Sequence, residues 1–89
     1  MAMHRRPRWI PAAAVERPDP HFVDASDFFL RGKRVGRVLW HPDGGGPFLE
    51  ERFDGQGLKH GPERERLESG QLIWEMPWVH GVQHGWHRQ

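Results

Sequence analysis

Three histidines near the end of the printed sequence have the spacing that most directly suggests metal chemistry. His80, His84 and His87 stand at i, i+4 and i+7, which would align them on one face of a helix. Gly81 and Gly85 lie between them, and glycine inside a helix is destabilising. In an extended strand, His80 and His84 would share a face and His87 would point away. Because no second ligand cluster has zinc-like spacing, we expect neither a metal site nor another cofactor.

The acidic residues are candidates for acid–base chemistry, but each group stands beside arginines. Glu50 and Glu51 precede Arg52, and a second group of glutamates alternates with arginines across residues 63–68. Such a pattern favours cross-strand ion pairs over general acid–base catalysis.

Two further motifs do not match a catalytic or phosphate-binding context. Ser26 lies between Asp24 and Asp27 but lacks the strand–turn–helix setting of a reactive serine. The segment DGGGP at residues 43–47 is followed by neither a lysine nor a helix, so it is a poor match to a phosphate-binding loop. We therefore predict no catalytic residue and no enzymatic activity.

The most asymmetric cluster of charge is a short basic segment, and we predict that it contributes to binding. It could contact an acidic partner or lipid headgroups, or it could be a solvated turn. Tryptophan and arginine are enriched at protein interfaces, so an exposed tryptophan near this charge would favour a protein partner. The candidate binding residues are Arg31, Lys33, Arg34, Arg37, Trp40, Trp78 and Trp86.

Length and composition restrict the fold and the kinds of partner. The chain of 89 residues is 36% hydrophobic and allows one small domain, and its 11 glycines and 8 prolines favour turns over long helices. The net charge of +1 is too small to attract the whole molecule to nucleic acid or to an anionic membrane. The absence of cysteine excludes disulfides and thiolate sites and fits a cytoplasmic protein. No apolar run is long enough to span a membrane.

The chain divides into two parts of different composition. Residues 1–21 contain four of the eight prolines and the cluster Arg5, Arg6 and Arg8, which predicts a flexible basic tail. Residues 22–89 consist of short apolar or mixed runs between glycine-containing turns, a pattern typical of β-hairpins. We therefore predict an all-β domain at 22–89, built from successive antiparallel hairpins and preceded by a loosely ordered tail.

A repeat of glycines runs through the predicted domain. Gly57 follows Gly32 by 25 positions, Gly81 follows Gly57 by 24, and each begins a Gly-x-x-x-Gly motif. A period in this range indicates repeat architecture, in which each unit is a hairpin that packs on its neighbour. Glycine adopts positive φ without steric cost, which suits the tight connections between hairpins. The predicted turn glycines are Gly32, Gly36, Gly57, Gly61, Gly70, Gly81 and Gly85.

The best-defined hairpin is expected at residues 62–79, with its turn at 68–71. Its second strand should present one apolar stripe to the core, because alternate residues of a strand share a face. Pro77 would lie on the other face, and it should fall at an edge or bulge because it cannot donate to a ladder. The predicted stripe is Leu72, Trp74, Met76 and Trp78.

The segment HGPERERLESGQLIWEMPWVHGVQHGW, at residues 60–86, resembles the MORN-type repeats of the bacterial YwqK-family antitoxins. The match covers about residues 57–88, and residues 32–56 are a looser copy. Glu63 stands where the family has a tryptophan, and Arg66 and Leu67 replace its paired aromatic residues. The matching residues are His60, Gly61, Pro62, Arg64, Glu68, Gly70, Gln71, Leu72, Gly81, His84 and Gly85.

The resemblance implies an elongated sheet and non-catalytic binding of a partner protein, of the antitoxin or immunity type, in which the partner would be a toxin. Because repeat arrays usually need about three units, the chain could also dimerise through an exposed sheet edge. Two alternatives remain at this stage. A phospholipid surface could bind the basic repeat junction, and nucleic acid could bind the arginine-rich tail with Trp9 beside it.

Overall fold

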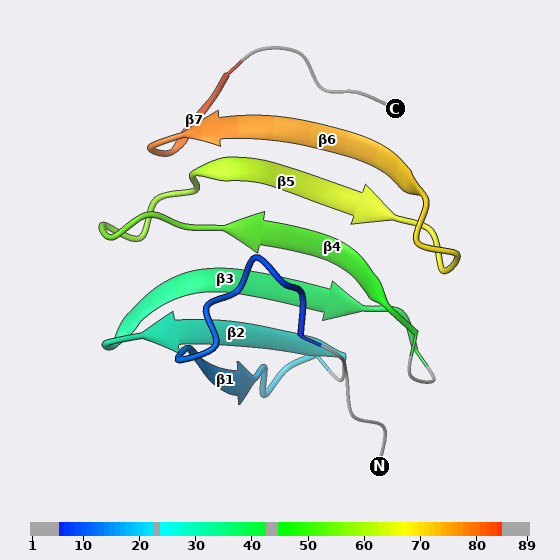
Figure 1. Cartoon of the computed structure of the whole chain (residues 1–89), viewed down its shortest axis with the longest axis horizontal. Coiled ribbons are helices and arrows are strands. Elements are labelled where there is room, and N and C mark those ends of the chain that lie inside the picture. Colours follow the sequence, from blue (N-terminus) through cyan, green and yellow to red (C-terminus); the bar gives the residue numbers. More distant parts are fainter. Residues whose placement is uncertain (1–5, 23, 43–44, 85–89) are drawn as a thin grey trace.

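The computed structural model describes residues 6–22, 24–42 and 45–84, and these form one open β-sheet (Figure 1). All seven strands are antiparallel and lie in chain order, so each strand pairs with its neighbours in the sequence. This confirms the predicted all-β fold of successive hairpins. The described residues form no helix that is long and apolar enough to cross a membrane. The strands are β1 (Val15–Pro18), β2 (Ala25–Leu30), β3 (Lys33–Trp40), β4 (Pro47–Arg52), β5 (Gly61–Arg66), β6 (Leu72–Val79) and β7 (Val82–Gln83).

Two hairpins close with the same kind of turn. Arg31 and Gly32 between β2 and β3 have φ angles of 53° and 78°, and His80 and Gly81 between β6 and β7 have φ angles of 45° and 86°. Two consecutive positive φ angles are typical of the type I′ turn, whose twist matches that of the flanking strands. The other predicted turn glycines with positive φ are Gly57, Gly61 and Gly70.

Gly36 does not have the predicted turn role. It lies inside β3, between Phe28 of β2 and Arg52 of β4. A Cβ atom at this position would lie 2.8 Å from two atoms of the Trp9 ring, so the close approach of that ring requires glycine. The turn assignment is therefore wrong for Gly36, and the one for Gly85 falls outside the described residues.

The register of the ladders gives the sheet two faces, because directly paired residues share a face. We call them the Glu50 face and the Met76 face. The Glu50 face carries one continuous row of paired residues: Ser26, Val38, Glu50, Arg64 and Glu75. The Met76 face carries Met76 and another such row: Ala25, Leu39, Leu49, Glu65 and Trp74.

The N-terminal residues cover part of the Glu50 face. In Figure 1 the segment before β1 crosses in front of the sheet over β2–β4. Ile10 and Ala14 of this segment are each 4% exposed and pack with Phe28, Val38 and Trp40 in the hydrophobic core. The structure therefore differs from the predicted loosely ordered tail from residue 6 onward. The segment is held by its apolar side chains and by the pairing of β1 with β2.

The predicted apolar stripe on β6 is partly present. Met76 is buried, and Trp74 and Trp78 are half-buried on the same face. A bulge between Glu65 and Arg66 pairs Leu72 with Arg66 instead, and the Leu72 side chain is exposed. The bulge removes Leu72 from the alternation, so Leu72 does not share a face with the other three residues. Trp74, Met76 and Trp78 lie on the Met76 face, opposite the cluster that contains Phe28 and Val38. The prediction that all four side chains face the hydrophobic core is therefore wrong.

The turn of this hairpin lies as expected, whereas Pro77 lies inside the β5–β6 ladder rather than at a bulge. Leu67 donates its backbone N–H to the carbonyl of Gln71 at 2.9 Å, and Gly70 donates to the carbonyl of Leu67 at 2.8 Å. Pro77 lies opposite Pro62, at a ladder position where neither residue can donate a hydrogen bond.

Candidate functional site

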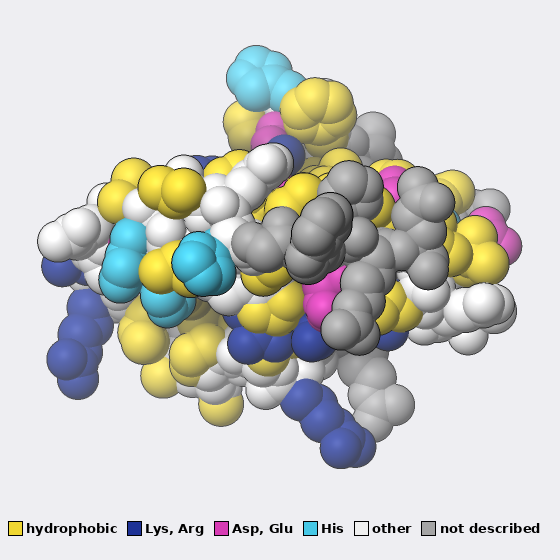
Figure 2. Space-filling view, turned by 90° about the horizontal axis from the view of Figure 1, so that it is seen from above, with side chains coloured by type: hydrophobic (Ala, Val, Ile, Leu, Met, Phe, Trp, Pro, Cys, Tyr) yellow, Lys and Arg dark blue, Asp and Glu magenta, His cyan; other side chains and the backbone are white. Residues whose placement is uncertain are grey.

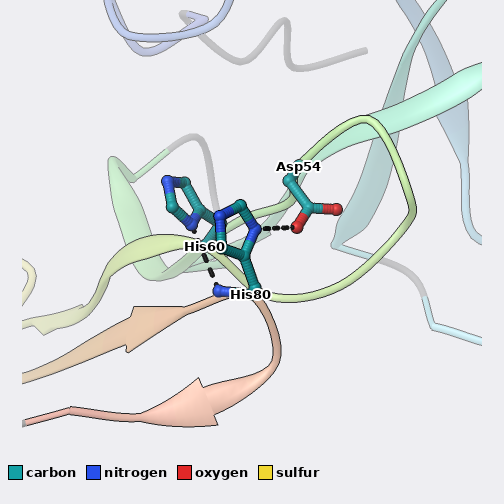
Figure 3. A group of neighbouring side chains, drawn as sticks. All are labelled: Asp54, His60 and His80. Carbon is teal, nitrogen blue, oxygen red and sulfur yellow. Dashed lines mark hydrogen bonds and ion pairs between the residues drawn. The ribbon is translucent and has the colours of Figure 1, made fainter.

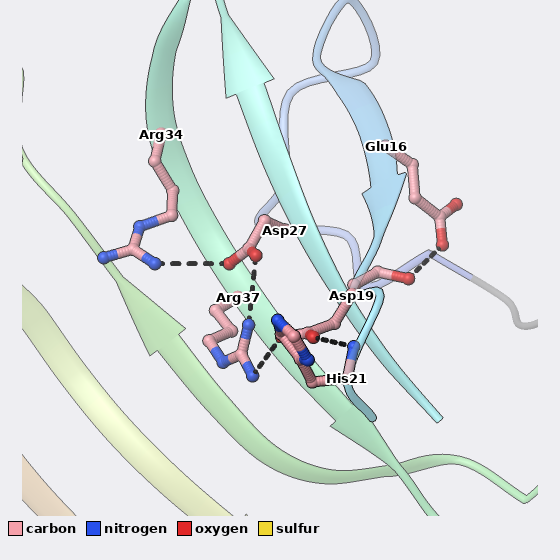
Figure 4. Close-up of polar contacts among 7 residues, drawn as sticks. Glu16, Asp19, His21, Asp27, Arg34 and Arg37 are labelled. Carbon is pink, nitrogen blue, oxygen red and sulfur yellow. Dashed lines mark hydrogen bonds and ion pairs between the residues drawn. The ribbon is translucent and has the colours of Figure 1, made fainter. Parts of the chain in front are cut away.

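Two of the four predicted basic binding residues form ion pairs within the sheet (Figure 4). Arg37 reaches between two aspartates, with its guanidinium 2.9 Å from Asp19 and 3.0 Å from Asp27. Arg34 lies 3.4 Å from Asp27, and its guanidinium stacks 4.1 Å from the centre of the Phe53 ring. Burial alone would lower the pKa of Arg37, but its bonds to the two aspartates raise that pKa above its usual value.

The remaining two basic residues differ in their surroundings. Arg31 is exposed in the β2–β3 turn, and Lys33 is exposed at the start of β3. The predicted basic cluster therefore presents two exposed cations, while the charges of Arg34 and Arg37 are balanced by carboxylates. The four residues therefore do not form one compact, anion-binding patch.

The predicted binding tryptophans lie in different environments. Trp40 is 4% exposed and belongs to the core, so its assignment to a binding surface is wrong. Trp78 is half-buried and donates its indole N–H to Glu63 at 2.9 Å, while the Lys59 ammonium lies 4.7 Å from the centre of its ring. Trp86 lies outside the described residues.

Ion pairs with cations of neighbouring segments are formed by three carboxylates of the two acidic groups, Glu50, Glu51 and Glu63. The pair between Glu50 and Arg66 joins β4 to β5, as the predicted cross-strand pairs would. Glu50 accepts from Arg66 at 2.8 Å, and Arg64 donates to Glu75 at 2.6 Å. Lys59 lies 2.7 Å from Glu51 and 3.0 Å from Glu63. Partial burial opposes the charge on Lys59, but these two carboxylates raise its pKa above the usual value.

Arg6 and the neighbouring Trp9 contact the rest of the fold. Arg6 donates to the carbonyls of Pro11 and Ala12 at 3.1 Å, and its guanidinium lies 5.1 Å from the Phe28 ring centre. The Trp9 ring is covered by the guanidinium of Arg52 at 4.6 Å. Arg8 is exposed, and Arg5 lies outside the described residues.

One cluster of titratable groups was not predicted: Asp54, His60 and His80 (Figure 3). Asp54 lies in the β4–β5 connection, His60 directly precedes β5, and His80 lies in the β6–β7 turn. Oδ2 of Asp54 lies 2.7 Å from Nδ1 of His80. The two imidazole rings stack with their centres 4.4 Å apart and their planes inclined by 28°. Each residue places one ligand atom within 4.8 Å of the other two.

Backbone hydrogen bonds hold the three residues in place. The backbone N–H of His80 donates to Nδ1 of His60 at 3.2 Å, and Gly81 donates to the carbonyl of Lys59 at 2.7 Å. The other oxygen of Asp54, Oδ1, accepts from the backbone N–H groups of Gln56 and Leu58 at 2.8 and 3.1 Å. The bond to His80 lowers the pKa of Asp54 to about 2, and the two backbone donors act in the same direction.

This cluster combines the ligand types that suit a transition-metal ion. Imidazole nitrogens and a carboxylate oxygen are common zinc ligands. Of the three histidines first considered for a metal, only His80 takes part. His84 is exposed and uses its backbone N–H to bond Pro77, and His87 lies outside the described residues. The signal that would have identified the cluster is the hairpin itself, which places His60 and His80 at the same end of adjacent strands.

The C-terminal edge of the sheet, which we define as β6 and β7, carries exposed apolar side chains. Of the seven large hydrophobic residues that are exposed in the described chain, three lie on this edge: Leu72, Val79 and Val82. Leu58 and Leu67 lie in the adjoining connections, whereas Val15 and Phe22 lie near the other edge. Figure 2 looks onto the C-terminal edge and shows histidines gathered at one end, with hydrophobic side chains around them.

The chain matches no protein-family model, no curated protein and no solved structure. The likeness to MORN-type repeats therefore remains a resemblance carried by residues 57–88. What the structure itself establishes is an open, seven-stranded antiparallel sheet of consecutive hairpins.

Proposed function

We propose that this protein is a non-catalytic module that binds a partner protein through the C-terminal edge of its sheet. The resemblance to MORN-type antitoxins supports a partner of the toxin class, which the module would hold in an inactive complex. The observation that carries the proposal is that β6 pairs with β7 over only a small part of its length. Among the described residues, β7 covers only the end of β6, at Trp78 and Val79.

The register identifies which backbone groups of β6 point outward. In an antiparallel ladder, hydrogen-bonded pairs alternate with pairs that make no bonds to each other. Pro62 and Pro77 face one another and cannot form a hydrogen-bonded pair. Arg64 and Glu75 lie two positions along the ladder from them, so these two residues also form no backbone hydrogen bonds with each other. The N–H and C=O of Glu75 therefore point away from β5. In agreement, the outward carbonyl of Pro77 accepts a bond from His84 at 2.8 Å.

An exposed edge of this kind can accept an extended segment of another protein as an additional strand. Main-chain hydrogen bonds then supply affinity, and side chains on alternate positions supply specificity. The exposed Leu72 and Val79 stand at the two ends of β6 and offer apolar contacts to such a segment. A partner strand opposite Glu75 would pair with that residue's outward N–H and C=O.

The other two partners suggested by the sequence receive less support. A phospholipid surface would need Arg34 and Arg37, whose charges are balanced by aspartates. A nucleic-acid arm would need Arg6 and Trp9, which contact the fold instead. A protein partner requires no rearrangement of these ion pairs.

The matched variants Glu75→Pro and Glu75→Ala test the proposal. Both lose the ion pair with Arg64, but only proline removes the outward N–H. Proline should be tolerated at position 75 because Pro77 already occupies an equivalent outward position of the same strand. Circular dichroism and urea unfolding establish that both variants fold.

The wild type and the two variants are then used as baits, and each captured protein is purified and its dissociation constant measured. We expect a partner that binds the wild type and the alanine variant with similar affinity and the proline variant at least about tenfold more weakly. Equal affinity for all three baits would contradict the proposed edge. Binding to anionic vesicles without any protein partner would contradict protein binding itself. If the captured partner is a second copy of the chain, the edge forms a homodimer and a partner of the toxin class is contradicted.

A further inference from the structure

We propose that Asp54, His60 and His80 together bind one divalent transition-metal ion of the zinc type. The site lies where the β4–β5 connection meets the β6–β7 turn, at one end of the C-terminal edge. This site is distinct from the edge of β6 around Glu75, and it adds a metal-dependent contact between two connections of the sheet.

The backbone brings the three ligands together before any ion binds. The bond from Gly81 to the carbonyl of Lys59 fixes the β6–β7 turn against the start of β5. Asp54 donates its own backbone N–H to the carbonyl of Leu58 at 2.8 Å, which closes the β4–β5 connection over the same place. The ligands therefore come from three short segments whose positions are already set by hydrogen bonds.

The distances between ligand atoms fit an ion after a small adjustment. Two ligand atoms of a tetrahedral zinc ion lie about 3.3 Å apart. Nδ1 of His80 and Oδ2 of Asp54 are 2.7 Å apart, so the ion would enter between them in place of the proton that they share. All three ligand atoms lie within 4.8 Å of one another, so the longest separation closes by at most about 1.5 Å.

Rotation of exposed side chains supplies that adjustment. Both histidines are exposed, and the His80 side chain is 63% accessible, so the stacked rings can turn apart without disturbing the core. Nδ1 of His60 would exchange its 3.2 Å bond from the His80 backbone for the metal, and water can take over that exposed N–H. Two imidazoles and one carboxylate favour zinc, copper or nickel, because calcium and magnesium prefer oxygen ligands.

The surroundings leave room for a further ligand. Asp54, Gly55, Gln56 and His80 line an open depression of about 420 Å³ beside the cluster. Three protein ligands with an open position are typical of zinc sites that also bind water or a group from another molecule. Occupancy would fasten the β4–β5 connection to the β6–β7 turn through bonds stronger than the present hydrogen bonds.

Zinc binding is tested on the untagged, full-length protein, titrated with zinc chloride alone in a calorimeter. Three conservative variants remove one ligand each. His80→Asn keeps a residue that tolerates positive φ, Asp54→Asn keeps an acceptor for Gln56 and Leu58, and His60→Gln keeps a polar side chain. His21→Ala and His84→Ala are the matched controls, because both remove an exposed imidazole outside the cluster.

We expect saturable binding of one zinc ion by the wild type and the two controls, with the affinity reduced at least about tenfold in each ligand variant. Cobalt should give the strong visible absorption of a four-coordinate site in the wild type and lose it in His80→Asn. The proposal is overturned if the wild type binds no zinc at a zinc concentration of about 100 µM, because a three-ligand site should have a dissociation constant well below this concentration. It is also overturned if His84→Ala reduces the affinity as much as His80→Asn does, or if the ligand variants bind as the wild type does.

Discussion

Trp9 donates its indole N–H to Oε2 of Glu50 at 2.7 Å, across 41 positions of the sequence. Glu50 is 5% exposed, and its other oxygen accepts from Arg66. A buried carboxylate is unfavourable unless it is paired and hydrogen-bonded, so both donors are needed to hold this charge inside the protein. The bond also connects the N-terminal segment to β4 and, through Arg66, to β5.

The first prediction concerns the contribution of Trp9 to stability. Trp9→Phe retains an aromatic ring but leaves Glu50 with one donor fewer, and should lower the free energy of unfolding by about 1 kcal/mol. Trp9→Ala also removes the ring from the Glu50 face and should lower it by about 2 kcal/mol, less than for a fully buried tryptophan because Trp9 is half-buried. Urea unfolding measures both values. Arg8→Ala, at an exposed neighbour, is the control, and equal stability of Trp9→Ala and the wild type would mean that the segment does not cover the sheet.

The second prediction concerns the close approach of Trp9 to Gly36. In Gly36→Ala the new methyl group would meet the ring at 2.8 Å, so the ring must shift, and we expect a loss of about 1–3 kcal/mol. The same substitution in a Trp9→Ala background should cost much less, because the obstructing ring is gone. Gly46→Ala is the control, since a Cβ there meets nothing within 4 Å. Additive losses in the double variant would contradict this explanation.

The third prediction concerns the turn between β2 and β3. Arg31 has a φ of 53°, which is unfavourable for a residue with a long side chain, and asparagine before glycine is preferred in type I′ turns. Arg31→Asn should therefore raise the free energy of unfolding by about 0.5–1 kcal/mol. Thermal or urea unfolding measures the gain. Lys33→Asn places the same residue in β3, where asparagine is disfavoured, and should produce no gain. A loss of stability in Arg31→Asn would show that Arg31 makes a contact worth more than the strain.

The fourth prediction concerns acid stability. The backbone N–H of His21 lowers the pKa of Asp19, burial opposes this, and the bond from Arg37 lowers the pKa further. Ionised Asp19 therefore stabilises the fold above its unfolded pKa of 3.8, and this contribution is lost as the pH falls below 3.8 toward the lower pKa of the folded state. Asp19→Asn should be less stable than the wild type at pH 7, and the difference in the free energy of unfolding should shrink as the pH falls below 3.8. Urea unfolding between pH 7 and pH 2.5 tests this, and a difference that stays constant over the range would contradict it.

The hairpins could be predicted from the sequence because their signals are local. The alternation of side-chain types in residues 62–79 and the spacing of 24 or 25 residues between glycines both indicate strands that pair with the next strand in the chain. The stripe on β6 failed at Leu72 because a bulge changes the alternation by one residue, and no residue type marks that bulge. Gly36 was assigned to a turn by its spacing alone, whereas its role depends on a tryptophan that is 27 positions away and packs across the sheet.

The N-terminal segment and the candidate metal site could not be predicted from the same local signals. The proline-rich composition predicts a disordered segment, but Ile10 and Ala14 pack in the hydrophobic core. This packing could not be predicted locally, because the rest of that core comes from β2 and β3. Asp54, His60 and His80 come together only when two turns meet, and their spacing matches no helix or short metal motif. Once the hairpin register is known, the proximity of His60 to His80 follows directly.

The order of the strands has a further consequence for how such a protein can change in length. Since each strand pairs only with its neighbours in the chain, a duplicated unit of 24 or 25 residues could be inserted between two hairpins without crossing any existing pair. The described N-terminal residues from residue 6 onward contact β2–β4, and they would not obstruct an insertion after β4. Growth by duplication would extend the molecule along one axis, so the number of units would set its span.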